Sequence, residues 1–315
     1  MNETKQKTQT YTKINTLYRR YKNLGKVELP SKAWVAFQNK IILDGFSDEE
    51  IRYLQNNLFD CFSKIDGTNT KIVFYPSTGE IAYGGKTDDA QLNMHDKIMP
   101  GICERIKPLL AEMFPPECAR FTPKQNEKRQ TVYYHLPFAE NPGEMFEDIH
   151  PNEMQTGDQR VVVMEEAPVY IYGELFGAKI QKGGGNYSDG IRFSVFDVCQ
   201  QGWWIPVGML AETCQKLGLD MVPYIGKMTI KEAEKMVMNG FATKVENVVN
   251  PEYLEEGIVA RPVVPLKDSH GNRIIVKIKH KDYSELRSAI QKVGEIEYNK
   301  FVAWYNEHKE EIENL

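Results

Sequence analysis

The sequence KIDGTN, residues 64–69, directly follows a strand-like run from Leu58 to Ser63. A lysine at the end of a strand projects its amine beyond the sheet, and the glycine after it allows another molecule to approach the backbone closely. Such an amine is suited to act as a nucleophile. The same letters also describe an ordinary hairpin turn, because Asp-Gly is among the commonest turn dipeptides. Other parts of the sequence must decide between the two interpretations.

Two later strand-like segments each carry one side chain that their apolar neighbours do not explain. In YGELFG, residues 172–177, Glu174 stands in an apolar run and needs a metal, a hydroxyl or a cation as partner. In FSVFDV, residues 193–198, Phe196 and the acid beside it lie on opposite faces of the strand. Core packing is the commoner use of such an aromatic ring, and a platform for adenine is the functional alternative.

Two further segments lie near the carboxyl-terminal end of the sequence. In EEGIVARP, residues 255–262, acids lead into a short apolar strand that ends on Arg261. In IIVKIK, residues 274–279, the alternation of a strand places Lys277 and Lys279 on the same face. Two lysines on one face of an otherwise buried strand are costly without an anion. A triphosphate would supply that anion, and an edge strand open to water is the simpler alternative.

The pattern of secondary structure favours an α+β fold, because short strands and helices are interspersed without regular βαβ alternation. Capping boxes predict helices that begin at Ser47 and Thr229, and Pro206 and Gly218 bracket a third helix. A fourth helix is predicted over residues 96–115, weakened by Pro100. The strands are expected at 58–63, 70–75, 161–164, 169–175, 191–198, 257–260 and 273–279. The glycine run 183–185 is interpreted as a mobile loop.

Composition predicts a soluble cytoplasmic protein. The 315 residues are 41% hydrophobic, the formal net charge is −5, and no apolar run reaches the roughly 18 residues that a membrane span needs. The polar start lacks the apolar stretch of a signal peptide. The five scattered cysteines are expected to be buried free thiols. Residues 1–26 contain seven Lys or Arg against the single Glu3, which is compatible with a nucleic-acid face on one side.

In this order the five segments resemble the nucleotidyltransferase motifs of covalent polynucleotide ligases and mRNA capping enzymes. The form KxxGTN, with Asn69 two residues after the glycine, resembles the RNA ligases. The opening YTKINTLY, residues 11–18, is similar to that of phage-type RNA ligases. The resemblance implies an α+β, ATP-grasp-like adenylation domain built on antiparallel sheets flanked by helices, without an OB-fold.

The expected domain organisation follows from the span of these motifs. Residues 1–57 would be an amino-terminal extension packed on the main domain, and residues 58–285 the nucleotidyltransferase domain. Residues 116–160 would be a poorly structured surface insertion in it, and residues 286–315 a short helical tail. Because the tail is short, substrate ends would be recognised partly by the extension or the insertion.

The resemblance also implies a function for individual residues. Lys64 would carry AMP covalently, with Ile65 beside it at the nucleotide, and Asn69 would contact the nucleotide and the acceptor end. Lys277 and Lys279 would act in catalysis by binding the α-phosphate and the departing pyrophosphate.

Further residues would complete the nucleotide site. Glu174 would bind the ribose or a metal, Phe196 would stack on adenine, and Glu256 would help to hold the metal. Lys86 stands where the family usually has Arg, and Arg261 where it often has Lys. Both keep the charge, but an arginine and a lysine make different contacts.

The resemblance implies an ATP-dependent RNA ligase that uses Mg²⁺, or Mn²⁺ in its place, and joins RNA 5′-phosphate and 3′-hydroxyl ends. We expect burial and the two distal lysines to favour the uncharged amine of Lys64 that must attack phosphorus. No membrane and no obligate protein partner are expected. The alternatives are an mRNA-capping-type guanylyltransferase, or a ligase that seals nicks in DNA or RNA; Asp66 stands where nick-sealing phage ligases often carry His.

Overall fold

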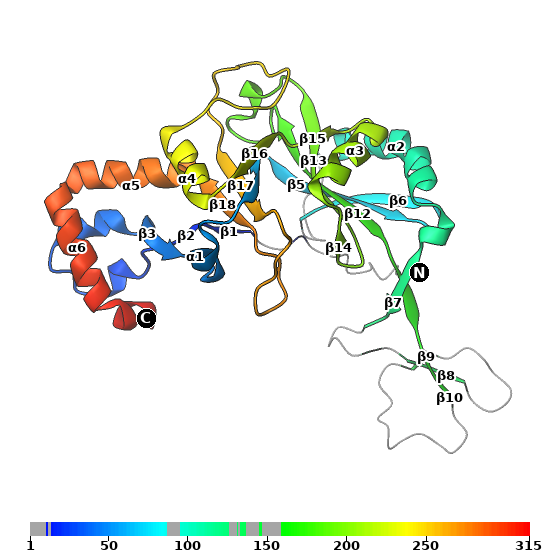
Figure 1. The fold of residues 1–315 in the computed structure, drawn as a ribbon, viewed down its shortest axis with the longest axis horizontal. Coiled ribbons are helices and arrows are strands. Elements are labelled where there is room, and N and C mark those ends of the chain that lie inside the picture. Colours follow the sequence, from blue (N-terminus) through cyan, green and yellow to red (C-terminus); the bar gives the residue numbers. More distant parts are fainter. Residues whose placement is uncertain are drawn as a thin grey trace. The chain divides into compact units, whose positions relative to one another are not determined.

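The structure is a computed structural model that describes residues 11, 14–86, 95–125, 131, 133–136, 145–146 and 159–315. Contacts divide the chain into two compact units. Unit 1 comprises Met1–Thr68, Glu174–Phe193 and Val222–Leu315, and unit 2 comprises Asn69–Gly173 and Ser194–Met221. Both units combine helices with mostly antiparallel sheets, which confirms the predicted α+β class (Figure 1).

Unit 1 is built on a five-stranded sheet within the described part of the chain. Most pairs are antiparallel, but the first strand joins the edge in parallel, with Thr16 opposite Lys277. The strands in order are β1 (Asn15–Thr16), β18 (Val276–Lys279), β17 (Gly257–Pro262), β4 (Phe59–Ser63) and β16 (Tyr224–Met228).

One face of this sheet is the core of unit 1. Cys61, Ile258 and Val276 lie on it, and they pack against helices α4 (Ile230–Asn239) and α5 (His280–Val293). Because side chains alternate along a strand, Lys277 and Lys279 lie together on the opposite face, as predicted. Burial of the apolar side chains therefore determines which face of the sheet carries the polar ones.

The amino-terminal elements of unit 1 pack beside its last helices. Figure 1 shows β2 and β3, in blue, next to the orange and red helices α5 and α6. Aromatic rings join them, with the rings of Tyr21 and Phe37 each 4.8 Å from that of Phe301. The elements are β2 (Tyr18–Arg20), η1 (Leu24–Lys26), η2 (Lys32–Phe37), β3 (Ile41–Phe46), α1 (Glu50–Leu54), α6 (Glu295–Glu307) and α7 (Lys309–Glu313).

The glycine run after β12 is not the mobile loop that we predicted. It forms the 3-10 turn η6 (Gly184–Asn186), and Gly184 is buried. A Cβ atom on Gly184 would lie 1.9 Å from the carbonyl oxygen of Gly177, so no other residue fits there. The glycine serves close packing of two chain segments within unit 1.

Unit 2 contains a six-stranded sheet among the described residues. Helix α2 (Met99–Met113) packs against β6 and against α3 (Val207–Leu217). The strands in order are β14 (Trp203–Trp204), β13 (Ile191–Gln200), β12 (Val169–Gly177), β5 (Thr68–Tyr75) and β6 (Glu80–Gly85), with β15 (Asp220–Met221) also paired to β13. The ends of β12 and β13 continue into unit 1.

The predicted surface insertion contains more strands than expected. Its described parts form η4 (Pro116–Cys118), β7 (Arg120–Pro123), β8 (Tyr133–Leu136), β9 (Met145–Phe146) and part of β10 (Gln159–Val162). The strand expected at 161–164 is divided between β10 and β11 (Met164–Ala167), which pair with β8 and β7. The other residues of the segment lie outside the described ones.

The helix signals were correct except in detail. Thr229 forms the predicted capping box with Glu232, and α3 runs between Pro206 and Gly218, whose φ is +60°. The box at Ser47 is wrong: α1 begins at Glu50 without a side-chain cap. Pro100 lies in the first turn of α2, where proline is favourable.

All five cysteines are free, and four are buried. Among the described residues, no helix is long and apolar enough to cross a membrane.

Candidate active site

Lys64 lies where three strands of the unit 1 sheet end. It follows β4, and its backbone N–H donates to the carbonyl oxygen of Gly257 over 2.9 Å. Gly257 is in turn paired with Lys279 at the end of β18. The register of the sheet thus brings residues far apart in sequence to one edge.

Three charged side chains meet at this edge. Lys64 Nζ lies 2.5 Å from Glu256 Oε2, and Lys279 Nζ lies 2.6 Å from Glu256 Oε1. Their side chains are between 19% and 28% exposed, so water only partly screens the attraction. We call these residues the lysine–glutamate cluster. Of the predicted site residues, Lys64, Glu256 and Lys279 are therefore in direct contact.

The two lysines keep Glu256 ionised. Burial by itself would raise the pKa of Glu256, but the charges and hydrogen bonds of Lys64 and Lys279 outweigh it and lower the pKa below its ordinary value. Both carboxylate oxygens are engaged by ammonium groups.

The surroundings of Lys64 differ from the expectation in one respect. Lys279 is close to it, as expected, but Glu256 lies between the two amines. The amine of Lys64 is therefore beside a carboxylate and not beside cations alone. Lys277 lies two positions before Lys279 in β18 and lines a separate pocket with β1 and β2.

The glycine of KIDGTN brings Glu174 against the lysine loop. A Cβ on Gly67 would lie 2.5 Å from Leu175 O and 2.7 Å from Glu174 Cγ, so only glycine allows this approach. Glu174 is the half-buried residue in a strand that is otherwise buried. Gln181 Nε2 also donates to Gly67 O over 3.2 Å. Ile65 is 3% exposed, so its side chain belongs to the core and its main chain is what a nucleotide could contact.

Asp66 and Glu256 influence one another across the loop. Burial, followed by the negative charge of Glu256, raises the pKa of Asp66 above its ordinary value, against the opposing effect of Lys64 and Lys279.

A further group of side chains holds the KIDGTN loop, and the sequence analysis did not predict it. Glu255 is 2% exposed; Tyr187 Oη donates to its Oε1 over 3.0 Å and Thr243 Oγ1 to its Oε2 over 2.9 Å. Tyr187 Oη also accepts from the backbone N–H of Asp66 over 3.5 Å. We call these residues the hydroxyl–glutamate anchor. The only signal for it was the acid pair at 255–256, because its partners lie far away in the sequence.

Arg261 lies on the same face of the sheet as Lys277 and Lys279. Its guanidinium carbon is 4.6 Å from the centre of the Phe62 ring, and Phe62 packs against Tyr224. Tyr224 Oη donates to Asp60 Oδ1 over 2.8 Å. These side chains extend the polar face of the sheet away from the lysine–glutamate cluster.

Three predicted site residues belong to unit 2. Asn69 starts that unit, and its Oδ1 is buried without a hydrogen-bond partner among the described residues. Lys86 is exposed just after β6. Phe196 is half-buried in β13, between the buried Val195 and Asp197. Phe196 therefore keeps an accessible side on a strand whose other residues are mostly buried.

The acids of unit 1 are suited to a hard cation. Glu256 is an ionised oxygen ligand, and Glu174 lies against the same loop. No group of three or more His, Cys, Asp or Glu side chains suitable for a metal occurs in the part of the chain that the structure describes. Mg²⁺ is commonly held by one or two carboxylates together with substrate phosphates, so this donor set fits it.

Comparison with known proteins finds solved structures of an RNA ligase from Naegleria gruberi. The complex with pyrophosphate is 14% identical, with a TM-score of 0.43 over 76% of this chain and 54% of that chain. A variant of that ligase with ATP and manganese is 13% identical, with a TM-score of 0.43 over 76% and 55%. The chain thus spans about half the length of these relatives.

No curated protein matches the chain. The family model for RNA ligases matches residues 61–279, which begin within β4 and end at Lys279. This match covers more than half of the sequence and includes the lysine–glutamate cluster. The chain therefore belongs to the RNA ligase family.

Proposed function

We propose that this protein is an ATP-dependent RNA ligase in which Lys64 carries AMP and transfers it to an RNA 5′-phosphate before the strand is sealed. The observation that carries the proposal is the lysine–glutamate cluster: a partly buried amine at the end of a rigid strand, held by one carboxylate. A nucleophile directly after a strand is well positioned, because the strand fixes its approach to a bound substrate in advance.

In the first step, Lys64 Nζ attacks the α-phosphorus of ATP. A nitrogen–phosphorus bond forms, the bond from the α-phosphorus to the bridging oxygen breaks, and pyrophosphate leaves. The amine must first lose a proton, and Glu256 is the acceptor within hydrogen-bond distance.

Glu256 is a weak base while two lysines hold it. We infer that the phosphates of ATP draw Lys279 away from Glu256 and towards their own charge. The carboxylate then loses one of the cations that lower its pKa and accepts the proton of Lys64 more readily. Lys279 would at the same time stabilise the charge that develops on the phosphate oxygens.

Two further transfers complete the reaction. An oxygen of the RNA 5′-phosphate attacks the phosphorus of lysyl-AMP and releases the amine of Lys64. A 3′-hydroxyl then attacks the activated 5′-phosphate, a phosphodiester forms and AMP leaves. Mg²⁺ would be held by Glu174, and by Glu256 in the later transfers, when Glu256 no longer carries the proton of Lys64. The ion would supply further neutralisation of phosphate charge. Asn69, Lys86, Phe196 and Arg261 are proposed to contact the nucleotide, with adenine stacked on Phe196.

The test is incubation with α-labelled ATP and Mg²⁺, followed by a denaturing gel. We expect the wild type to become labelled and Lys64→Ala to lose at least about 10⁴-fold of the rate, since no other group replaces a lost nucleophile. Lys231→Ala, an exposed lysine on α4, is the matched control and should be labelled normally.

Label that persists in Lys64→Ala would refute the assignment of Lys64. Labelling by GTP in preference to ATP would instead indicate a capping-type guanylyltransferase. A panel of RNA and DNA ends would then separate the joining of single strands from the sealing of nicks.

A further inference from the structure

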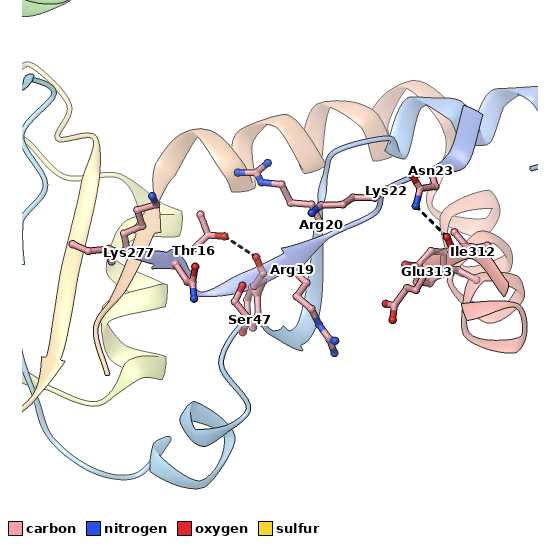
Figure 2. Close-up of a pocket in the computed structure, with 13 residues that line it drawn as sticks. Thr16, Arg19, Arg20, Lys22, Asn23, Ser47, Lys277, Ile312 and Glu313 are labelled. Atoms are coloured by element: carbon pink, nitrogen blue, oxygen red, sulfur yellow. Dashed lines mark hydrogen bonds between the residues drawn. The ribbon is translucent and has the colours of Figure 1, made fainter. Parts of the chain in front are cut away.

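A pocket of about 460 Å³ lies in unit 1, between the amino-terminal strands, β18 and the last helix (Figure 2). Its volume is in the range of small-ligand sites, roughly 300–1,000 Å³. The charged side chains that line it are Arg19, Arg20, Lys22, Lys277 and Glu313. Four of these five charged residues are cations, and the chain's net charge of −5 makes such a concentration of positive charge uncommon.

The cations of this pocket, which we call the amino-terminal pocket, are not equally compensated. Arg20 is bound to Asp282 over 2.6 Å, so its charge is largely neutralised. Arg19 has a longer contact to Glu49, 3.3 Å, and both of those side chains are well exposed, so the pair is weak. Lys22 is exposed and has no ion pair within the described ranges. Arg19 and Lys22 therefore keep more of their positive charge available than Arg20 does.

One hydrogen-bond donor of a lining residue lacks a partner. Among the described residues, Arg19 Nε is buried and has no acceptor. A buried donor without a partner costs free energy, so a ligand that draws the Arg19 side chain towards its own oxygens would relieve that cost. Asn15, Thr16 and Ser47 add neutral polar groups to the wall. An anion with several acceptor oxygens, such as a phosphate, matches this combination of charge and donors.

The amino-terminal pocket adjoins the lysine–glutamate cluster through one strand. Lys277 lines the pocket, and Lys279, two positions later on the same face of β18, binds Glu256. Two residues along a strand span about 7 Å. Thr16 is the register partner of Lys277, so the parallel pairing of β1 with β18 sets this spacing. A phosphate in the pocket would lie near the end of the sheet where AMP is proposed to be transferred.

We propose that the amino-terminal pocket binds a phosphate of the RNA strand that is to be joined. The proposal rests on the proposed ligase function and assigns part of substrate recognition to the amino-terminal segment. The pyrophosphate portion of ATP shares the same chemistry, and the experiment separates the two sources.

The test compares two variants that each lose an ion pair with Glu49, one inside the pocket and one outside it. Arg19 and Arg52 each bind Glu49 at 3.3 Å, but only Arg19 lines the pocket. We expect Arg19→Gln to bind a 5′-phosphorylated RNA oligonucleotide about tenfold more weakly, since a charge-assisted contact is lost. Arg52→Gln should bind like the wild type. Binding is measured without ATP, by fluorescence anisotropy at several salt concentrations.

A second pair of variants avoids the ion pair altogether. Lys22→Ala should lower the salt dependence of RNA binding by about 0.7 in the slope of log K against log salt, as expected for one lost contact to a single strand. Lys32→Ala, an exposed lysine in η2 outside the pocket, should leave the slope unchanged.

The outcomes distinguish this proposal from the ligase proposal. Equal RNA affinity of Arg19→Gln and Arg52→Gln, together with an unchanged slope for Lys22→Ala, would overturn the pocket assignment. The pocket assignment would also be overturned if Arg19→Gln and Lys22→Ala raised the KM for ATP in lysyl-AMP formation but bound RNA like the wild type. The pocket would then bind the pyrophosphate portion of ATP. A wild type that binds RNA through the pocket but never takes up label would overturn only the ligase proposal.

Discussion

Glu255 and Glu256 are neighbours in the sequence, but their carboxylates lie in opposite surroundings. Glu255 is buried in the hydroxyl–glutamate anchor, and burial raises its pKa although Thr243 and Tyr187 donate hydrogen bonds to it. Glu256 lies between two ammonium groups, which lower its pKa despite burial. Hydroxyl partners tolerate a protonated carboxyl, whereas lysines keep a carboxylate ionised. One acid is therefore suited to hold the loop and the other to take part in chemistry.

The largest difference between the two acids should appear in lysyl-AMP formation. Glu256→Gln removes the charge that Lys64 and Lys279 share, and an amide neither compensates both nor accepts the proton of Lys64. We expect the rate to fall by about 10²–10³-fold, the range for losing one preorganised polar group from a catalytic site. Quenched time courses with labelled ATP measure it.

The exposed Glu252 provides the control for that experiment, because its side chain makes no contact with either lysine. Glu252→Gln should keep the wild-type rate. If Glu256→Gln also keeps the wild-type rate of lysyl-AMP formation, the lysine–glutamate cluster is only a structural ion pair. Glu256 then takes no more part in the reaction than Glu255 does.

A smaller effect is expected when the hydroxyl–glutamate anchor is loosened. Tyr187→Phe removes the donor to Glu255 and the acceptor of the Asp66 N–H. A buried acceptor that loses a partner costs about 1–3 kcal/mol, measured as the free energy of unfolding in urea. The rate at saturating ATP should fall about tenfold or less, because Lys64 is less well positioned.

Tyr253→Phe is the matched variant. The ring of Tyr253 packs edge-on against Tyr187 at 5.1 Å, but among the described residues the side-chain donors to Glu255 are Tyr187 and Thr243. Tyr253→Phe should change neither the stability nor the rate appreciably. If both tyrosine variants lose stability but neither changes the rate, Tyr187 supports the fold and does not position Lys64.

The smallest effect concerns the pH dependence of stability, and its sign should differ between the two acids. The folded pKa of Glu256 is below its ordinary 4.5, so its contribution is complete above that pH and is lost as the pH falls through the folded value. The folded pKa of Glu255 is raised, so its contribution is complete below 4.5 and is lost as the pH rises through the folded value.

Unfolding in urea between about pH 2.5 and pH 8 tests these signs. Relative to the wild type, Glu256→Gln should lose less stability as the pH falls below 4.5, and Glu255→Gln should gain stability as the pH rises above 4.5. If both substitutions changed the pH dependence of the free energy of unfolding in the same direction, the pKa values of the two carboxyls would not be shifted in opposite directions.

Much of the fold could be predicted because local rules decide it. Alternation placed Lys277 and Lys279 on one face, and it holds because Val276 and Ile278 are buried on the other. The capping box at Thr229 formed because an amphipathic helix follows it. The box at Ser47 did not form, since α1 is a short helix whose ends are set by the loops around it.

The site was less predictable, because its geometry depends on contacts between distant segments. KIDGTN identified Lys64, but Glu256 as its partner depends on the pairing of β4 with β17. Tyr187 and Thr243 were missed, since nothing near them in sequence signals a buried acid. The run Gly183–Gly185 was misinterpreted because the sequence alone does not distinguish a glycine required for close packing from a glycine in a flexible loop.

The parallel pairing of β1 with β18 has a consequence for how the molecule is made. Asn15 is synthesised well before its partner Val276, because the two residues are far apart in the sequence. Closing so long a loop is slow, and the early strand must wait with its backbone unpaired. The edge that carries Lys277 and Lys279 is thus completed only after β18 has been synthesised, and a nascent chain lacks the proposed phosphate-binding surface until then.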